Sequence, residues 1–214
     1  MKCVEQYGVF WRDNKHADMS DDDKVIYLTF DAGYENGNIE KILDVLKSEE
    51  VCGNFFILSN LVNKNLELVN RMLDEGHTVA NHTARHKNMS KIKNKQDFEK
   101  ELKDLEVVFE EKTGAEIKKY YRPPEGEFTE ENLKWAEELG YKTVFWSFAY
   151  ADWDNSKQIC KETALKKILD NIHNGEVILL HPTSETNAAI MSDLIKALKE
   201  EGFRFGNLDE LCNS

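Results

Sequence analysis

The sequence predicts an α/β protein with a single domain, a distorted, TIM-like (β/α)7 barrel. Short β-rich runs alternate with amphipathic helical stretches in about seven units, which implies a parallel sheet with right-handed crossovers. Polar residues that could carry chemistry follow five separate strands: Asp31, His82, Arg122, Asp152 and His181. In a barrel the carboxyl ends of all strands meet at one mouth, whereas an open doubly wound sheet would spread these residues along a wide edge. A barrel is therefore favoured.

In the first half of the chain, hydrophobic spacing separates strands from helices. Apolar and β-branched runs predict strands at residues 25–30, 54–58 and 77–80. Apolar residues that recur every three or four positions predict helices at residues 39–48, 66–75 and 97–112. Gly76 and Gly114 follow the second and third of these helices, and glycine is common just beyond a helix end.

The second half continues the same alternation. The predicted strands are residues 120–121, 143–148, 177–180 and 203–205. The predicted helices are residues 129–139, 163–173 and 191–201. Pro123 and Pro124 break the chain after the first of these strands, because proline lacks an N–H and restricts the backbone. Thr129 can then cap the helix that follows.

The composition is that of a soluble globular protein. Hydrophobic residues make up 41% and charged residues 32% of the 214 positions, as expected for one domain with a substantial core. Acidic residues outnumber basic ones by 40 to 28, and the net charge of −12 argues against nucleic-acid binding, which depends on Lys and Arg. No apolar run approaches the roughly 18 residues of a membrane span. We expect a monomer in which residues 1–24 pack on the barrel as an N-terminal extension and residues 25–214 form the functional domain.

Four cysteines are isolated from one another: Cys3, Cys52, Cys160 and Cys212. The sequence has no CxxC pair, which argues against a thiolate zinc site or a thioredoxin-like motif. Cys3 and Cys212 lie near the two ends of the chain, and chain termini are often close in space, so a disulfide between them is one option. Four free thiols are the favoured interpretation.

Asp31 and the pair His82 and His86 are the first candidate functional residues. Asp31 ends a predicted strand in the run Thr29–Gly33, where a carboxylate could act as a base or could simply form a turn. His82 and His86 are spaced as HxxxH and could share one metal ion, although two histidines four apart also occur by chance. A metal site would need a third protein ligand and an open position for water as well.

The later candidates lie in a proline turn and after the last strands. Arg122 begins a stiff Arg-Pro-Pro-Glu-Gly turn, in which it could hold a carboxylate bidentately while the turn presents a backbone N–H to an oxyanion. The alternative interpretation of the turn is a simple chain reversal. Two further pairs, Asp152-Trp153 and Leu180-His181, follow strands, although the tryptophan and the histidine could equally be packing residues.

In their order along the chain, these pieces resemble the five motifs of the NodB-like polysaccharide deacetylases. Those motifs are a TFDDG box, an HxxxH box, an Arg-Pro-Pro turn, a DW pair and a Leu-His ending. In this sequence they correspond to Thr29–Gly33, His82–His86, Arg122–Gly126, Asp152-Trp153 and Leu180-His181. The resemblance covers about residues 25 to 212. The stretch Tyr27–Asn38 (YLTFDAGYENGN) is most similar to the muramic-acid branch, the delta-lactam-forming de-N-acetylases of the spore cortex.

The resemblance implies a hydrolase that removes N-acetyl groups from amino sugars of a cell-wall glycan, with N-acetylmuramic acid of peptidoglycan as the expected sugar. It implies that Asp31 is the general base that activates water and that Arg122 fixes its orientation. It also implies that His181 protonates the departing amine, with Asp152 raising its pKa. The backbone N–H of Glu125 would stabilise the oxyanion. The pocket for the acetyl methyl group would be shaped by Leu179, Leu180 and Trp153.

One residue departs from the family pattern. The second carboxylate of the first box, which is the family's third metal ligand, is Ala32 here, and a methyl group cannot coordinate a metal. The resemblance therefore implies a divalent metal, expected to be zinc, held by His82 and His86 with water or with Asp31 itself. One alternative is a catalytically impaired pseudoenzyme that binds glycan. Another is a deacetylase of chitin- or xylan-type polysaccharide, because Glu125 stands where many relatives have Tyr.

The resemblance also implies a protein that is extracellular or associated with the cell wall. Residues 1–6 do not form a signal peptide with an apolar centre, so we expect the leader to lie outside this sequence. A cytoplasmic location is the alternative.

Overall fold

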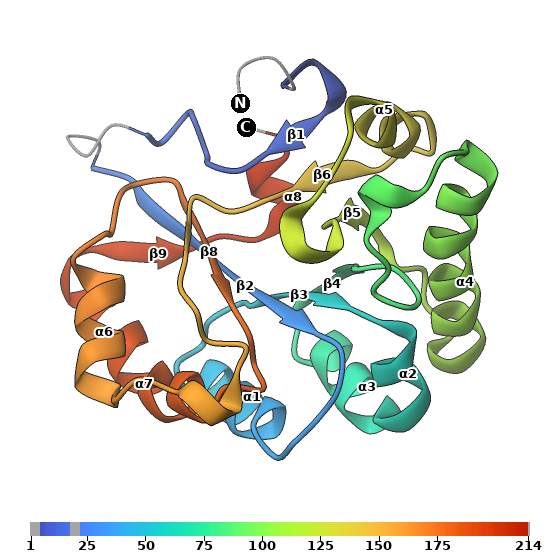
Figure 1. Ribbon diagram of the computed structural model, residues 1–214. Coiled ribbons are helices and arrows are strands. Elements are labelled where there is room, and N and C mark those ends of the chain that lie inside the picture. The colour runs from blue at the N-terminus through green and yellow to red at the C-terminus, as the bar shows by residue number, and fades with distance from the viewer. Residues whose placement is uncertain (1–4, 18–21, 214) are drawn as a thin grey trace.

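Strand β2 (Lys24–Ala32) lies at the centre of the sheet in this computed structural model, which describes residues 5–17 and 22–213. The described residues form a nine-stranded sheet in the order β1-β6-β5-β4-β3-β2-β8-β7, with β9 also paired to β2. All pairs of these strands are parallel. The sheet curls into a half-barrel with helices around it (Figure 1). The prediction of a single-domain, distorted (β/α)7 barrel is confirmed.

The other strands are short, and the helices that connect them vary in length. The strands are β1 (Val9–Phe10), β3 (Asn54–Ile57), β4 (Thr78–Asn81), β5 (Lys118–Tyr121), β6 (Lys142–Val144), β7 (Phe148–Ala149), β8 (Glu176–Leu180) and β9 (Phe203–Phe205). The helices are α1 (Ile39–Ser48), α2 (Ser59–Lys64), α3 (Leu66–Asp74), α4 (Lys95–Thr113), α5 (Glu130–Glu138), α6 (Lys161–Leu169), α7 (Glu185–Glu200) and α8 (Leu208–Leu211).

Alternating side chains along β2 divide the core into two layers. Ile26 and Phe30 are completely buried and pack with apolar residues of the surrounding helices. Val25 and Tyr27 pack in a second cluster, inside the barrel. Because successive side chains on a strand point to opposite faces, Asp31 projects on the same side as Val25 and Tyr27, at the carboxyl end of the strand. This parity brings its carboxylate to the mouth of the barrel.

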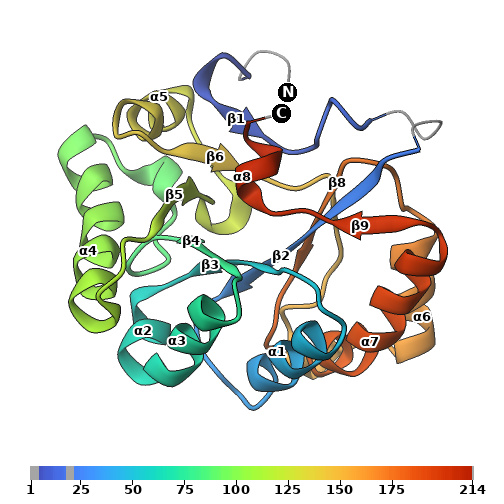
Figure 2. The ribbon, with the colours of Figure 1, turned by 180° about the vertical axis from the view of Figure 1, so that it is seen from behind.

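The helices begin and end where capping residues allow. Thr129 caps α5 as predicted, because its Oγ1 accepts a hydrogen bond from the Asn132 N–H at 3.2 Å and its N–H donates to Asn132 Oδ1 at 3.1 Å. Gly114 ends α4 with a φ of 71°, a left-handed conformation that glycine adopts without strain. Seen from behind, α1, α3 and α7 cover one part of the outer surface while α4 covers another (Figure 2).

The largest difference from the sequence prediction concerns residues 143–148, which are not one strand. They divide into the end of β6 and the start of β7, which lie at different positions in the sheet, and residues 145–147 cross between them. The carbonyl groups of Val144 and Phe145 accept hydrogen bonds from the Arg122 side chain, which holds the crossing segment in place. Helix α2 was not predicted, because its short polar sequence buries only Leu61 and Val62.

The described residues 5–17 of the N-terminal extension pack against the barrel. β1 pairs with β6, and the Asp13 N–H donates to the Gly175 carbonyl at 2.8 Å. The Tyr27 hydroxyl inside the barrel donates to Asp13 Oδ2 at 2.6 Å, so the extension is also fixed by a buried side-chain contact. The division of the chain into an extension (residues 1–24) and a functional domain (residues 25–214) stays a prediction.

Among the described residues, Cys52, Cys160 and Cys212 are free cysteines. Cys3, the other member of the disulfide considered above, lies outside the described residues. None of the helices in the described part of the chain has both the length and the apolar character that crossing a membrane requires.

Candidate active site

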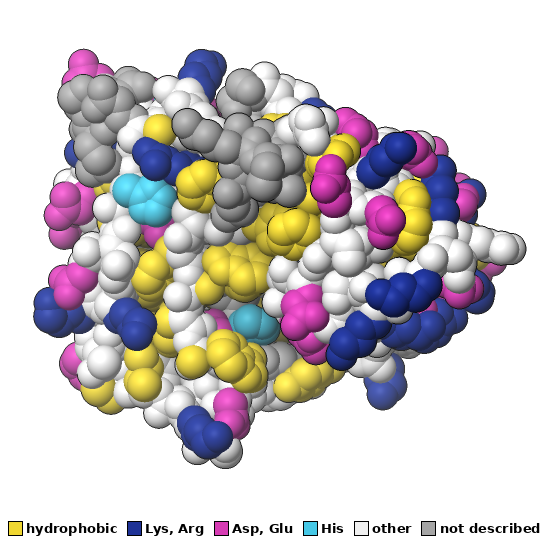
Figure 3. Space-filling view, turned by 45° about the horizontal axis from the view of Figure 1, so that its top comes forward, with side chains coloured by type: hydrophobic (Ala, Val, Ile, Leu, Met, Phe, Trp, Pro, Cys, Tyr) yellow, Lys and Arg dark blue, Asp and Glu magenta, His cyan; other side chains and the backbone are white. Residues whose placement is uncertain are grey.

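A pocket of about 670 Å³ opens at the carboxyl ends of the strands. In the space-filling view, apolar side chains gather around a histidine in the hollow at the middle of this face (Figure 3). Most of the residues that the sequence singled out line the pocket: Asp31, His82, His86, Glu125, Trp153 and His181. Arg122 and Asp152, the two remaining charged candidates, are buried next to it.

Asp31 is held in position by Arg122, whose side chain is completely buried. Arg122 Nη1 donates to Asp31 Oδ1 at 2.9 Å and to Thr29 Oγ1 at 2.8 Å. Its Nε and Nη2 donate to the carbonyl groups of Val144 and Phe145, at 3.0 and 2.9 Å. The predicted bidentate contact with the carboxylate is therefore wrong. A single nitrogen reaches Asp31, because the other donors bind the segment that crosses from β6 to β7.

Positive and polar neighbours keep Asp31 ionised. Burial alone would raise the pKa of Asp31, but the charges of the Arg122 guanidinium and the His181 imidazolium and the hydrogen bond from Arg122 oppose it, and that pKa lies below its ordinary value. The guanidinium of Arg122 in turn stacks on Phe56, 4.1 Å from the ring centroid. Asp31 is thus a carboxylate at neutral pH and can accept a proton from water.

His181 is oriented by Asp152, which is almost completely buried. The His181 Nδ1–H donates to Asp152 Oδ1 at 2.7 Å, which leaves Nε2 free for the pocket. Asp152 Oδ2 accepts from the His181 backbone N–H at 2.8 Å and from Asn187 Nδ2 at 2.6 Å. Burial alone would lower the pKa of His181, but the hydrogen bond and charge of Asp152 outweigh it and raise that pKa above its ordinary value. His181 can therefore carry a proton to a leaving group.

His82 and His86 lie on a loop after β4, not on a helix. Thr83 and His86 have φ values of 77° and 56°, in the left-handed region that costs strain for residues other than glycine. Within the loop, Thr83 Oγ1 accepts a hydrogen bond from the His86 N–H at 3.0 Å. The loop is also bound to α4, because the Ala84 N–H donates to the Glu101 carbonyl at 2.9 Å. The two imidazole centroids lie 5.1 Å apart as a result.

These two imidazoles are the candidate metal ligands that the sequence predicted. His82 Nδ1 donates to the Arg122 carbonyl at 2.8 Å, and its Nε2 lies 3.6 Å from Asp31 Oδ2. Burial lowers the pKa of His82 to about 4, so the ring is neutral and able to coordinate. Ala32 is buried among apolar residues and adds no donor. Among the described residues, no group of three or more His, Cys, Asp or Glu side chains could hold a metal ion. The donor set therefore does not match a usual catalytic zinc site, which has three protein ligands.

The turn after β5 brings Glu125 to the pocket. Glu125 has a φ of 60°, and its Oε2 accepts a hydrogen bond from Asn88 Nδ2 at 3.0 Å. The next residue, Gly126, also has a positive φ, and a Cβ there would lie 2.7 Å from the Trp146 ring. Glycine thus allows the turn to approach the aromatic wall closely. The role of the Glu125 N–H towards an oxyanion stays a prediction.

The apolar wall differs from the prediction in one residue. Leu179 and Trp153 line the pocket. Leu180 does not, because it is completely buried on the other face of β8, in the cluster that packs against the helices. Neighbouring side chains on a strand point to opposite faces, so Leu179 and Leu180 cannot both reach the pocket.

Several pocket residues were not among the sequence candidates: Tyr34, Leu58, Trp146, Ala149, Tyr150 and Thr183. Tyr34 lies directly beyond the first motif and could have been found by extending it. Trp146 and Tyr150 belong to the segment around the crossing from β6 to β7, where no local motif marks them.

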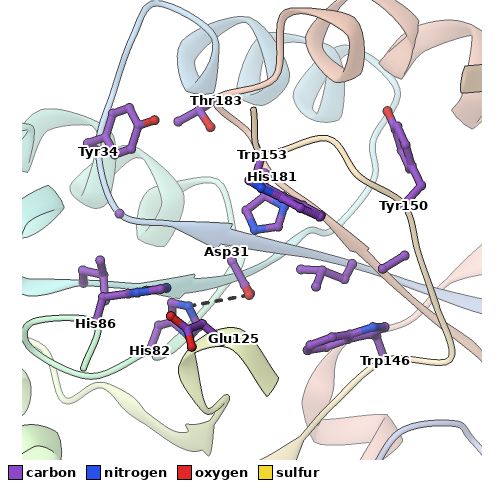
Figure 4. Close-up of a pocket in the computed structure, with 14 residues that line it drawn as sticks. Asp31, Tyr34, His82, His86, Glu125, Trp146, Tyr150, Trp153, His181 and Thr183 are labelled. Carbon is purple, nitrogen blue, oxygen red and sulfur yellow. Dashed lines mark ion pairs between the residues drawn. The ribbon is translucent and has the colours of Figure 1, made fainter. Parts of the chain in front are cut away.

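The arrangement places a proton acceptor and a proton donor in one pocket. Asp31 and His181 lie close to each other in the close-up, with Trp153 beside the histidine (Figure 4). A carboxylate can deprotonate a water molecule there while an imidazolium protonates the group that leaves. This chemistry fits hydrolysis of an acyl derivative such as an amide.

Comparison with known proteins places this geometry in a family. The profile of the family "Polysaccharide deacetylase" matches residues 18–144. The peptidoglycan-N-acetylmuramic acid deacetylase PdaA of Bacillus subtilis (strain 168) is 39% identical, over 97% of this chain and 76% of that protein. A peptidoglycan-N-acetylglucosamine deacetylase of Bacillus cereus is 34% identical, over 87% of this chain and 67% of that protein.

A solved structure shares the fold closely. The structure of Bacillus subtilis PdaA, a family 4 carbohydrate esterase, superimposes with a TM-score of 0.91 at 38% identity and covers 98% of this chain and 87% of that one. Both the sequence match and the fold match extend over nearly the whole chain. The protein belongs to the polysaccharide deacetylase family.

Proposed function

We propose that this protein is a peptidoglycan deacetylase that removes the acetyl group from N-acetylmuramic acid. The observation that carries the proposal is the pairing of two residues with opposite proton affinities in one pocket. Asp31 has a lowered pKa beside Arg122, and His181 has a raised pKa beside Asp152. Two titratable groups that differ in this way are suited to act as base and acid. The likeness to PdaA supports muramic acid as the sugar.

In the proposed reaction, Asp31 takes a proton from a water molecule whose oxygen attacks the acetamide carbonyl carbon. A new C–O bond forms, the carbonyl carbon becomes tetrahedral, and its former carbonyl oxygen becomes an oxyanion. The His181 Nε2–H then protonates the sugar nitrogen as the C–N bond breaks, which yields acetate and a free amine. Leu179 and Trp153 line the pocket near this centre and can accept the acetyl methyl group.

Deacetylases of this family are generally metal-dependent. In this chain His82 and His86 are the pair of imidazoles at the position of the family's metal site, and the carboxylate that would complete their set is absent because Ala32 occupies its position. The base and acid steps described above use only Asp31, His181 and their partners.

Release of acetate from purified glycan tests the proposal directly. The substrates are peptidoglycan glycan strands freed of peptide, with chitin oligomers as the comparison for N-acetylglucosamine. We expect acetate release from the peptidoglycan strands, with free amine on the muramic residues by mass spectrometry. Binding of these strands without acetate release, at any divalent metal supplied, would instead identify a glycan-binding pseudoenzyme.

The pH dependence of the reaction is expected to follow His181. The acid must be protonated, so kcat/KM should stay high below the raised pKa of His181 and fall as the pH increases through it. In Asp152→Asn the carboxylate that raises this pKa is lost, and the falling limb should move to lower pH. The measurement is kcat/KM for acetate release across the pH range.

A matched control is Asp154→Asn, which changes a partly exposed carboxylate two residues away. It should leave the falling limb where it is in the wild type. An unmoved limb in Asp152→Asn, or a shift to higher pH, would contradict the assignment of His181 as the acid.

We further propose that the protein acts outside the membrane, at the cell wall, and during sporulation. The support is the location of its proposed substrate and the similarity of Tyr27–Asn38 to the spore-cortex branch. Fractionation of cells that produce the full-length protein, with detection by antibody, checks this location.

A further inference from the structure

Tyr34 is an exposed aromatic residue at the edge of the pocket. It lies between β2 and α1, with a side chain 51% exposed, and it lines the pocket together with Trp153, which is 61% exposed. Among the described residues only two other large hydrophobic side chains are similarly exposed, Val107 and Phe128. Exposed apolar surface at a binding pocket is typical of a site that a ligand covers.

The loop that carries Tyr34 is fixed before any ligand binds. Asn36 Nδ2 and Asn38 Nδ2 both donate to the Thr183 carbonyl, at 2.8 and 3.1 Å. Asn60 Nδ2 donates to the Gly33 carbonyl at 3.0 Å on the other side of the tyrosine. The loop is therefore joined to the segment that follows His181 and to α2. A ring on a fixed backbone loses little conformational entropy when it binds a ligand.

The aromatic rings of the pocket flank the reacting carboxylate on both sides. In the close-up, Tyr34 lies on one side of Asp31, and Trp146 and Tyr150 lie on the other (Figure 4). The residues that line the pocket include neither Lys nor Arg. A sugar has an apolar C–H face and a polar edge, so aromatic stacking is the attraction that this pocket offers to its rings. Aromatic surface on both sides of the centre matches a chain of sugars better than one sugar.

We propose that Tyr34 is a specificity-determining residue that stacks on the sugar next to the one being deacetylated, so that the enzyme selects an extended glycan chain. The proposal rests on the proposed function and adds to it the length of chain that the pocket requires. Stacking on a neighbouring sugar stabilises the bound substrate and the transition state equally. Its loss should therefore raise KM and leave kcat nearly unchanged.

The test compares wild type with Tyr34→Ala on peptidoglycan glycan oligomers freed of peptide and separated by length, together with the single sugar N-acetylmuramic acid as the shortest substrate. For the longest oligomers the KM of Tyr34→Ala should be about five- to tenfold higher. For the shortest the ratio of the two KM values should approach one. Tyr34→Phe, which keeps the ring, should recover most of the lost affinity. Asn36→Ala loosens the loop but keeps the ring, and should raise KM by a smaller factor.

The matched control is Val107→Ala, on α4 and outside the pocket, which removes an equally exposed apolar side chain and should not change KM at any length. Binding of the longest oligomer by calorimetry to wild type and Tyr34→Ala tests the stacking even without turnover. Absence of acetate from every glycan would count against the proposed function alone. Equal affinity of wild type and Tyr34→Ala for long oligomers would overturn the role of Tyr34.

Discussion

Asp31→Asn is expected to lower kcat for acetate release by about a thousandfold. The amide cannot take the proton of the attacking water, so the chemical step loses its general base. The side-chain oxygen of Asn can still accept the hydrogen bond that Arg122 Nη1 donates to Asp31 Oδ1 in the wild type. The pocket should therefore keep its shape, and affinity for glycan oligomers should change little. Steady-state kinetics and calorimetry on the same preparation measure the two quantities separately.

Asp193→Asn is the matched control, because it neutralises an exposed carboxylate on α7 that does not line the pocket. It should have the kcat of the wild type. Loss of a general base lowers the rate by roughly a hundredfold or more. If Asp31→Asn kept more than roughly a tenth of the wild-type kcat, Asp31 would not be the general base.

Arg122→Met is expected to produce the largest loss of stability, about 3–5 kcal/mol in the free energy of unfolding. The substitution leaves the Asp31 carboxylate without its buried cation. It also removes the donors from Thr29 Oγ1 and from the carbonyl groups of Val144 and Phe145. Buried polar groups without a partner destabilise the folded state, whereas in the unfolded state the same groups bind water. Denaturant unfolding followed by fluorescence and circular dichroism measures the change.

Arg204→Met is the control for this substitution. Arg204 also forms ion pairs with two carboxylates, Asp23 and Glu210, but all three side chains are substantially exposed. Exposed ion pairs contribute little, so the loss should be no more than about 1 kcal/mol. A loss for Arg122→Met that was as small as that for Arg204→Met would show that the buried network does not hold the barrel mouth together.

The parts of the fold that depend on local pattern were predictable from sequence. Helix α1 has the predicted bounds, and Thr129 caps α5, because apolar spacing and capping act over a few residues. The convergence of Asp31 and His181 on one pocket was also predictable, since the carboxyl ends of parallel strands meet in a barrel. These two residues are far apart in the chain, and the order of the motifs that contain them indicated that they belong to one site.

The features that depend on contacts across the barrel were not predictable in the same way. The strand expected at residues 143–148 is interrupted because Arg122, more than twenty positions earlier, binds the carbonyl groups of Val144 and Phe145. Leu180 was misplaced because an apolar run on a strand that is buried on both faces does not reveal which residues face inward. Tyr34 lies in a loop, where neither helical nor strand periodicity marks a side chain as part of a pocket.

The two walls of the pocket differ in how firmly the backbone holds them. Asp31 sits on β2, which has paired neighbours on both sides, β3 and β8. Trp146 and Tyr150 flank β7, a two-residue strand at the end of the sheet whose one partner in the described sheet is β8. Local opening costs least where backbone pairing is sparse. Local opening should therefore cost less free energy around β7 than around the strand that carries the base.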